Sequence, residues 1–200
     1  MSKINTSLRN TLRNKLGWST NRNIIVIESD DWGSFRYKNR YYRDKFMSPE
    51  DKYKCLMSYQ DCFESSEDLE LLFNVLKQVK SKNSTHPKFT FLVNPSNPDF
   101  KKIKADNFKL FHKETFLDTL ENRSDGEAIL KHYKNALSNN ILEIAFHGRE
   151  HLNVKQWITD LQNNDKIAHL GFENKTWGFS KRYLPEYKKN YRSTYYITSY

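Results

Sequence analysis

Three short apolar runs, separated by longer segments of helical periodicity, constrain the fold of this chain more than any other feature. The runs span residues 24–27, 88–93 and 141–146. The first run, residues 24–27, is β-branched and apolar throughout, which is typical of a strand buried on both faces of a parallel sheet. Residues 67–80, 125–139 and 153–163 repeat apolar side chains at helical spacing. Strands that alternate with helices predict an α/β fold built from parallel β-α units.

The remaining segments complete a single predicted domain over residues 1–200, a length that suits one hydrophobic core. Residues 1–20 contain a predicted N-terminal helix, because leucine or isoleucine recurs every fourth residue from Ile4 and Gly17 follows as a stop. Residues 34–86 are expected to form a long insertion. Residues 99–121 follow neither periodicity, and the aromatic residues 195–200 resemble a further strand.

The basic charge of the chain lies at its two ends. The net charge is +9, and residues 1–23 contribute +5 while residues 181–200 contribute +4, so residues 24–180 are neutral. A nucleic-acid-binding protein more often places basic residues around its recognition surface, so no nucleic-acid partner is expected. Solvated terminal charge is the favoured interpretation. Contact of the basic N-terminal helix with an anionic membrane surface remains an alternative.

The sequence contains no targeting or disulfide pattern. No apolar run is long enough to span a membrane, and the basic N-terminus lacks the apolar stretch of a secretory signal. We therefore predict a cytoplasmic protein without a transmembrane segment, with a membrane-peripheral location as the alternative. Cys55 and Cys62 form neither a disulfide framework nor a zinc-finger spacing, so both are interpreted as ordinary thiols.

Side chains that bind metals follow two of the predicted strands. Asp30 and Asp31 follow the first apolar run, and His147 follows the third run, with His151 four residues later. The carboxyl ends of parallel strands meet at one rim, where the chemistry of α/β folds gathers. Neighbouring parallel strands would therefore bring these four side chains close together.

Two histidines at this spacing can bind one divalent cation. If the chain turns helical after the strand, residues i and i+4 lie on one face, and Gly148 allows a sharp backbone turn beside the metal. Two adjacent carboxylates repel each other unless a cation neutralises them. In an extended segment they point in different directions, so one can face the metal while the other takes a proton from water.

Each motif alone also has a purely structural interpretation. Two histidines at this spacing can lie on the surface, and aspartates followed by glycine are common in turns. Together the motifs supply one carboxylate and two imidazoles, which leaves a metal position open for water, as a catalytic zinc site requires. A metal in such a site lowers the pKa of its water and polarises a carbonyl oxygen.

The two motifs resemble those of the polysaccharide deacetylase family, also called the NodB homology domain. Its first motif, an apolar strand that ends in two aspartates with a glycine shortly after, is similar to residues 27–33, and its His-x-x-x-His motif is similar to residues 147–151. The likeness covers residues 22–165. It implies an irregular β/α barrel, with zinc as the metal and cobalt, nickel or manganese as alternatives. It also implies that Asp30 is the catalytic base and that the metal ligands are Asp31, His147 and His151.

Three departures separate the chain from the family pattern. Trp32 intervenes between the aspartates and Gly33, the 34–86 insertion lengthens the gap between the motifs, and the family's later motifs are not visible. Those motifs supply an arginine that orients the base, an Asp-Trp pair that lines the cleft and a histidine that acts as general acid. Three clear strands are too few to close a barrel, so we expect a barrel that is incomplete at its C-terminus, or a truncated chain.

Four more side chains near the motifs need an interpretation. Trp32 is assigned to substrate binding, because aromatic rings stack on sugars, with a cap over the core as the alternative. His169 is a candidate for the missing general acid, but its apolar neighbours are typical of a helix end. Arg149 and Glu150 are expected to point away from the metal or to form local hydrogen bonds.

The resemblance implies a metal-dependent hydrolase that removes acetyl groups from an amino sugar or polysaccharide, so an acetylated carbohydrate is the expected partner. Two alternatives remain open. One is a catalytically inactive, deacetylase-like remnant that binds metal or glycan. The other is an amidase or esterase that acts on a different substrate. No feature of the sequence predicts the oligomeric state.

Overall fold

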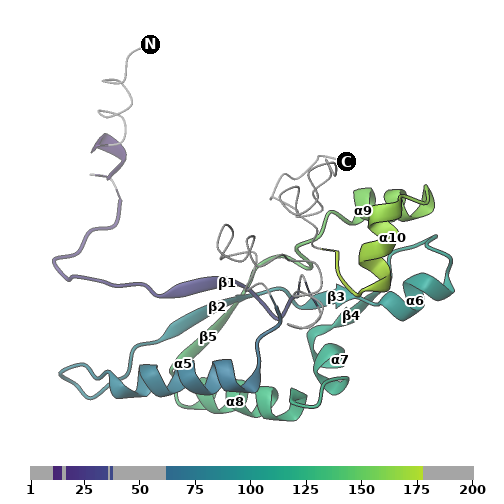
Figure 1. Ribbon diagram of the computed structural model, residues 1–200. Coiled ribbons are helices and arrows are strands. Elements are labelled where there is room, and N and C mark those ends of the chain that lie inside the picture. The colour runs from purple at the N-terminus through teal and green to yellow at the C-terminus, as the bar shows by residue number, and fades with distance from the viewer. Residues whose placement is uncertain (1–10, 15–16, 36, 38–61, 178–200) are drawn as a thin grey trace, which may run out of the picture.

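A three-stranded parallel sheet in the order β1-β2-β5 forms the centre of the fold (Figure 1). The computed structural model describes residues 11–14, 17–35, 37 and 62–177. In chain order its elements are β1 (Glu28–Trp32), α5 (Ser66–Gln78), β2 (Phe89–Val93), β3 (Ser96–Pro98), α6 (Phe100–Ala105), β4 (Lys113–Thr115), α7 (Phe116–Glu121), α8 (Gly126–Ser138), β5 (Leu142–Phe146), α9 (Val154–Gln162) and α10 (Lys166–Glu173).

The parallel pairing confirms the predicted α/β class. β2 lies in the middle and pairs in parallel with β1 on one side and with β5 on the other. The predicted strands over 88–93 and 141–146 are confirmed, as are the helices predicted over 67–80, 125–139 and 153–163. The residues that the structure describes form no closed barrel, so the barrel type stays a prediction.

The first predicted strand was placed too early in the chain. Residues 24–27 lie before β1, which begins at Glu28, and Ile25 is 87% exposed rather than buried. The reason is the position of the neighbouring strand. β2 begins only at Phe89, and Glu28 already pairs with Thr90, so residues 24–26 extend beyond the start of β2. An apolar run is buried only where a partner strand and a covering helix reach it.

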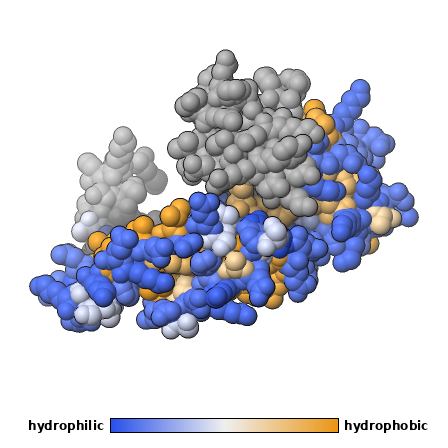
Figure 2. All heavy atoms as spheres, turned by 60° about the horizontal axis from the view of Figure 1, so that its bottom comes forward, coloured by the Kyte–Doolittle hydropathy of each residue, from blue (hydrophilic) through white to orange (hydrophobic). Residues whose placement is uncertain are grey.

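Helices α5 and α8 pack together and cover one face of the sheet (Figure 1). Ser65 and Asp68 form a capping box at the start of α5. Phe91 of β2 lies fully buried between the sheet and these helices, in ring contact with Phe73 and Tyr133. The outer surface of the two helices is largely hydrophilic (Figure 2). The two helices thus cover one face of the sheet whose strand ends lie next to the aspartates and histidines.

Residues 96–121 contain short elements that no periodicity predicted. β3 and β4 form an antiparallel pair, and α6 and α7 have six residues each. Local side-chain caps start both helices, with Asp99 accepting a hydrogen bond from the backbone of Lys102, and Thr115 forming a capping box with Asp118. Together with α9 and α10, these elements lie beyond the carboxyl ends of the parallel strands (Figure 1).

Several predictions concern residues at the ends of the chain and in the insertion. Residues 11–14 are helical, which agrees with the N-terminal helix, while the rest of that helix, Cys55 and residues 195–200 lie outside the described residues. Cys62 carries a thiol and is not part of a disulfide, as expected. No helix within the described ranges is long and apolar enough to cross a membrane.

Candidate metal centre

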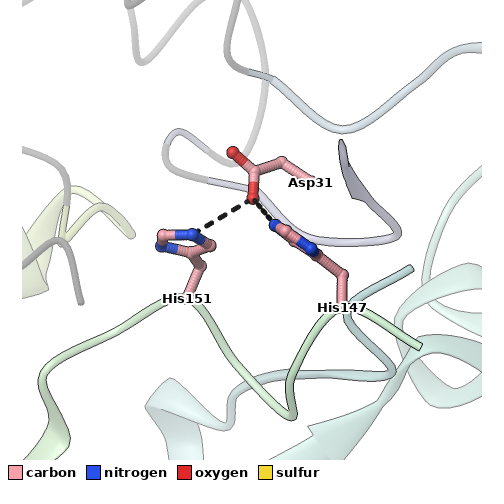
Figure 3. Close-up of side chains that lie close together, drawn as sticks. All are labelled: Asp31, His147 and His151. Atoms are coloured by element: carbon pink, nitrogen blue, oxygen red, sulfur yellow. Dashed lines mark ion pairs between the residues drawn. The ribbon is translucent and has the colours of Figure 1, made fainter. Parts of the chain in front are cut away.

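Asp31, His147 and His151 converge at the carboxyl ends of β1 and β5 (Figure 3). Asp31 Oδ1 lies 3.5 Å from Nε2 of His147 and 3.5 Å from Nε2 of His151. All three ligand atoms lie within 4.8 Å of one another, and no other such cluster occurs in the part of the chain that the structure describes. The three side chains predicted as metal ligands are therefore brought together by the fold.

The distance from Asp31 Oδ1 to each histidine nitrogen fits a shared divalent ion better than a direct ion pair. Zinc bonds of 2.0–2.2 Å at tetrahedral angles separate two ligand atoms by about 3.4 Å, close to the 3.5 Å observed. A charge-assisted hydrogen bond is shorter, at roughly 2.7–2.9 Å. His112 and Asp106 show the contrast within this chain, because their Nε2 and Oδ2 atoms are 2.9 Å apart.

A left-handed turn at the end of β1 presents Asp31. The register between β1 and β2 shifts between Ser29 and Trp32, and Asp31 has a φ of 66°. Gly33 follows with a φ of 76°, where a Cβ would lie 3.0 Å from the carbonyl oxygen of Asn94. The glycine of the Asp-Asp-Trp-Gly sequence is thus required by both its backbone conformation and its close neighbours.

The two histidines lie on a loop, so the helical turn considered for residues 147–151 does not form. The backbone amide of His147 donates to the carbonyl of Val93, which anchors the loop to β2 at 2.9 Å. Gly148 then turns the chain with a φ of 95°, as its position predicted, and α9 begins only at Val154. The strands that carry the ligands are also not neighbours, because β2 lies between them. The ligands meet across the end of β2.

Asp30 lies beside this cluster and is more exposed. Its Oδ2 is 3.6 Å from Nε2 of His147, and its side chain is 62% exposed, compared with 20% for Asp31. A carboxylate in this position can accept a proton from a water molecule at the cluster. The structure therefore separates the adjacent aspartates into one sheltered and one open carboxylate.

Trp32 packs against the core. Its ring stacks on Phe91 with centroids 3.5 Å apart and meets the edge of Phe89. These contacts agree with the alternative in which Trp32 caps the core. Its assignment to substrate binding stays a prediction, and the side chain remains partly exposed.

The other polar residues near the motif make local contacts. Arg149 and Glu150 form an ion pair with each other, as expected, and the hydroxyl of Ser96 donates to Glu150 at 3.2 Å. His169 lies inside α10, where its Nε2 is 2.9 Å from the carbonyl oxygen of Leu161. Its ring also packs edge-on against Phe108. His169 therefore contributes to the packing of α10 against α9.

Three polar side chains that contact both ligand loops were missed. Asn94, Ser96 and Asn97 follow β2 and are buried. In the sequence these residues only follow the end of the predicted strand over 88–93. Their position directly after β2 could have indicated them, because polar residues that follow a central parallel strand lie at the same rim as the ligands.

Glu64 is a buried carboxyl in contact with the turn that follows Asp31. Its Oε2 accepts a hydrogen bond from the Gly33 amide at 3.3 Å, and its Oε1 accepts one from the Tyr133 hydroxyl at 2.6 Å. Burial raises the pKa of Glu64 above its ordinary value of 4.5, and the hydrogen bonds offset this only in part. Glu64 therefore ties the 34–86 insertion to the turn that follows Asp31.

The raised pKa of Glu64 predicts that stability falls as pH rises. The folded protein keeps this proton at pH values where the unfolded carboxyl has released it. The contribution of Glu64 to the free energy of unfolding is therefore fully present below pH 4.5 and is lost as pH rises through its folded-state pKa. Glu64→Gln has an amide that does not release a proton, so it should remove this decrease in unfolding free energy with rising pH. Urea unfolding at a series of pH values would measure the difference.

A matched control for this measurement is Glu70→Gln, on an exposed position of α5. It should keep the pH dependence of the wild-type protein, because its carboxyl is hydrated in both states. If the wild-type protein and Glu64→Gln had the same slope of unfolding free energy with pH, Glu64 would not be protonated in the folded state.

No protein-family model, curated protein or solved structure matches this chain. The likeness to polysaccharide deacetylases therefore rests on the two motifs, and membership of that family stays a prediction.

Proposed function

We propose that the protein is a metal-dependent hydrolase that removes acetyl groups from an amino sugar or polysaccharide, with zinc as its metal. The observation that carries the proposal is the position of Asp31 Oδ1, 3.5 Å from Nε2 of both His147 and His151. One carboxylate and two histidines leave a coordination position open, as catalytic zinc sites require. The likeness of both motifs to polysaccharide deacetylases supports an acetylated carbohydrate as the substrate.

Each side chain has its own role in the proposed reaction. Asp31, His147 and His151 hold the ion, which supplies Lewis acidity toward the acetyl carbonyl and toward water. Asp30 accepts the proton of the attacking water at Oδ2. The oxygen of that water forms a bond to the carbonyl carbon, the bond from this carbon to the sugar nitrogen or oxygen breaks, the leaving atom takes a proton from solvent, and acetate is released. Trp32 contacts the sugar through the part of its side chain that is exposed.

Metal content and acetate release, measured on the same preparations, test both halves of this proposal. We expect about one divalent ion per chain after dialysis, and acetate release from N-acetylglucosamine oligomers or O-acetylated glycans. Metal binding without acetate release from any glycan would favour a protein that binds metal or glycan without turnover, or an amidase or esterase with another substrate. A protein that binds no metal would overturn the proposal.

The role of Asp30 predicts a selective loss of turnover in Asp30→Asn. The amide keeps the shape of the side chain but cannot accept a proton, so kcat for acetate release should fall about 100- to 10,000-fold while the metal content stays at the wild-type level. Glu28→Gln, at an exposed position of the same strand, is the control and should retain turnover. Loss of the ion from Asp30→Asn would instead identify Asp30 as a ligand.

A further inference from the structure

The segment Asn94–Asn97, here called the polar bridge, lies between the two loops that carry the proposed metal ligands. It follows β2 directly, and its three polar residues Asn94, Ser96 and Asn97 are almost fully buried. Buried amide groups are costly unless their hydrogen bonds are made, so their partners indicate what the segment is fixed to. Those partners lie on both ligand loops.

Asn94 fixes the loop that carries the histidines. Its side chain is 0% exposed, and its Nδ2 donates to the carbonyl of His147 at 2.9 Å and to the carbonyl of Gly148 at 3.1 Å. Its backbone amide donates to the carbonyl of Trp32 at 2.8 Å, next to Asp31. One residue therefore contacts the main chain of both loops.

The rest of the polar bridge repeats this arrangement. Ser96 donates to the carbonyl of Arg149 through its backbone amide at 3.1 Å and through its hydroxyl at 3.0 Å. Asn97 donates from Nδ2 to the carbonyl of Gly33 at 2.9 Å and accepts from the amide of Phe35 at 3.2 Å. Asn94 and Ser96 thus hold the histidine loop, while Asn97 holds the turn after Asp31.

We propose that the polar bridge is a positioning element for the metal centre, with Asn94 as the positioning residue for the loop of His147 and His151. The inference rests on the proposed metal site. Asn94 touches the backbone beside the ligands and none of the ligand atoms, so it acts through loop geometry. Groups that orient metal ligands in this way typically change metal affinity about 10- to 100-fold when they are removed.

Asn94→Asp tests this role with a single-atom change. The carboxylate keeps the size of the amide but offers no hydrogen to the two carbonyls. We expect about 10- to 100-fold weaker Co²⁺ binding in a titration, and an altered visible spectrum of bound Co²⁺. The spectrum reports coordination geometry, which a role confined to stability would leave unchanged. Asn94→Ser, which keeps one short donor, should fall between the wild type and Asn94→Asp, and it replaces Asn94→Asp if that variant does not fold.

Asn174→Asp is the matched control, because Asn174 is also a buried asparagine whose Nδ2 donates to a backbone carbonyl, that of Leu170 at the end of α10. It should bind Co²⁺ with wild-type affinity and spectrum. A folded Asn94 variant with wild-type affinity and spectrum would overturn the positioning role alone. A wild-type protein that binds no Co²⁺ would overturn the metal site and the positioning role together.

Discussion

Asp31→Ala is expected to lose its metal ion and, with it, all acetate release. Oδ1 of Asp31 is the atom that both histidines approach, at 3.5 Å each, so its removal leaves two imidazoles with no carboxylate between them. Loss of a group that merely orients a ligand typically weakens binding about 10- to 100-fold, and loss of a ligand should cost more than 100-fold. Titration with Zn²⁺ and metal analysis after dialysis would measure this effect.

The control for this substitution is Asp106→Ala. Asp106 is also paired with a histidine, His112, but that pair lies outside the ligand cluster. Its removal should leave metal content and turnover unchanged. If Asp31→Ala retained one ion per chain, the carboxylate of the cluster would not be a ligand, and the proposed zinc site would have to be abandoned.

The ligand cluster was predictable because its signals are local. Each ligand lies close after an apolar run, and parallel strands bring such ends to one rim whichever of them are neighbours. The intervening β2 therefore did not disturb the prediction, although β1, which carries Asp31, and β5, which His147 follows, are not neighbours in the sheet. The assumed helix after His147 was unnecessary, because Gly148 folds the loop so that both imidazoles face Asp31.

The position of β1 was not predictable from its own residues. Residues 24–27 are more apolar than Glu28–Trp32, yet Glu28–Trp32 forms the strand. The start of β1 is set by the start of β2, because a strand forms only where its partner is present. Pairing of this kind depends on residues that are distant in sequence. The polar bridge was missed for the same reason, since an asparagine after a strand gives no sign of which carbonyls its amide will meet.

Phe91→Ala is expected to remove a large part of the free energy of unfolding. Phe91 is fully buried, stacks on Trp32 at 3.5 Å, and contacts the rings of Phe73 and Tyr133 from the two covering helices. Replacing a buried phenylalanine with alanine typically costs about 3–5 kcal/mol, out of a total of about 5–15 kcal/mol for a domain. Urea unfolding of wild-type and variant proteins under the same conditions would measure the difference.

Phe146→Ala provides the matched control in the same sheet. Phe146 ends β5 but is 73% exposed, so its removal takes little apolar surface out of the core and should cost less than about 1 kcal/mol. A loss below about 1 kcal/mol in Phe91→Ala would contradict the burial of its ring between the sheet and the two helices. Because Trp32 stacks on Phe91 and directly follows Asp31, the same variant should also bind Zn²⁺ more weakly. The core beneath β2 would then contribute to the metal centre as well as to stability.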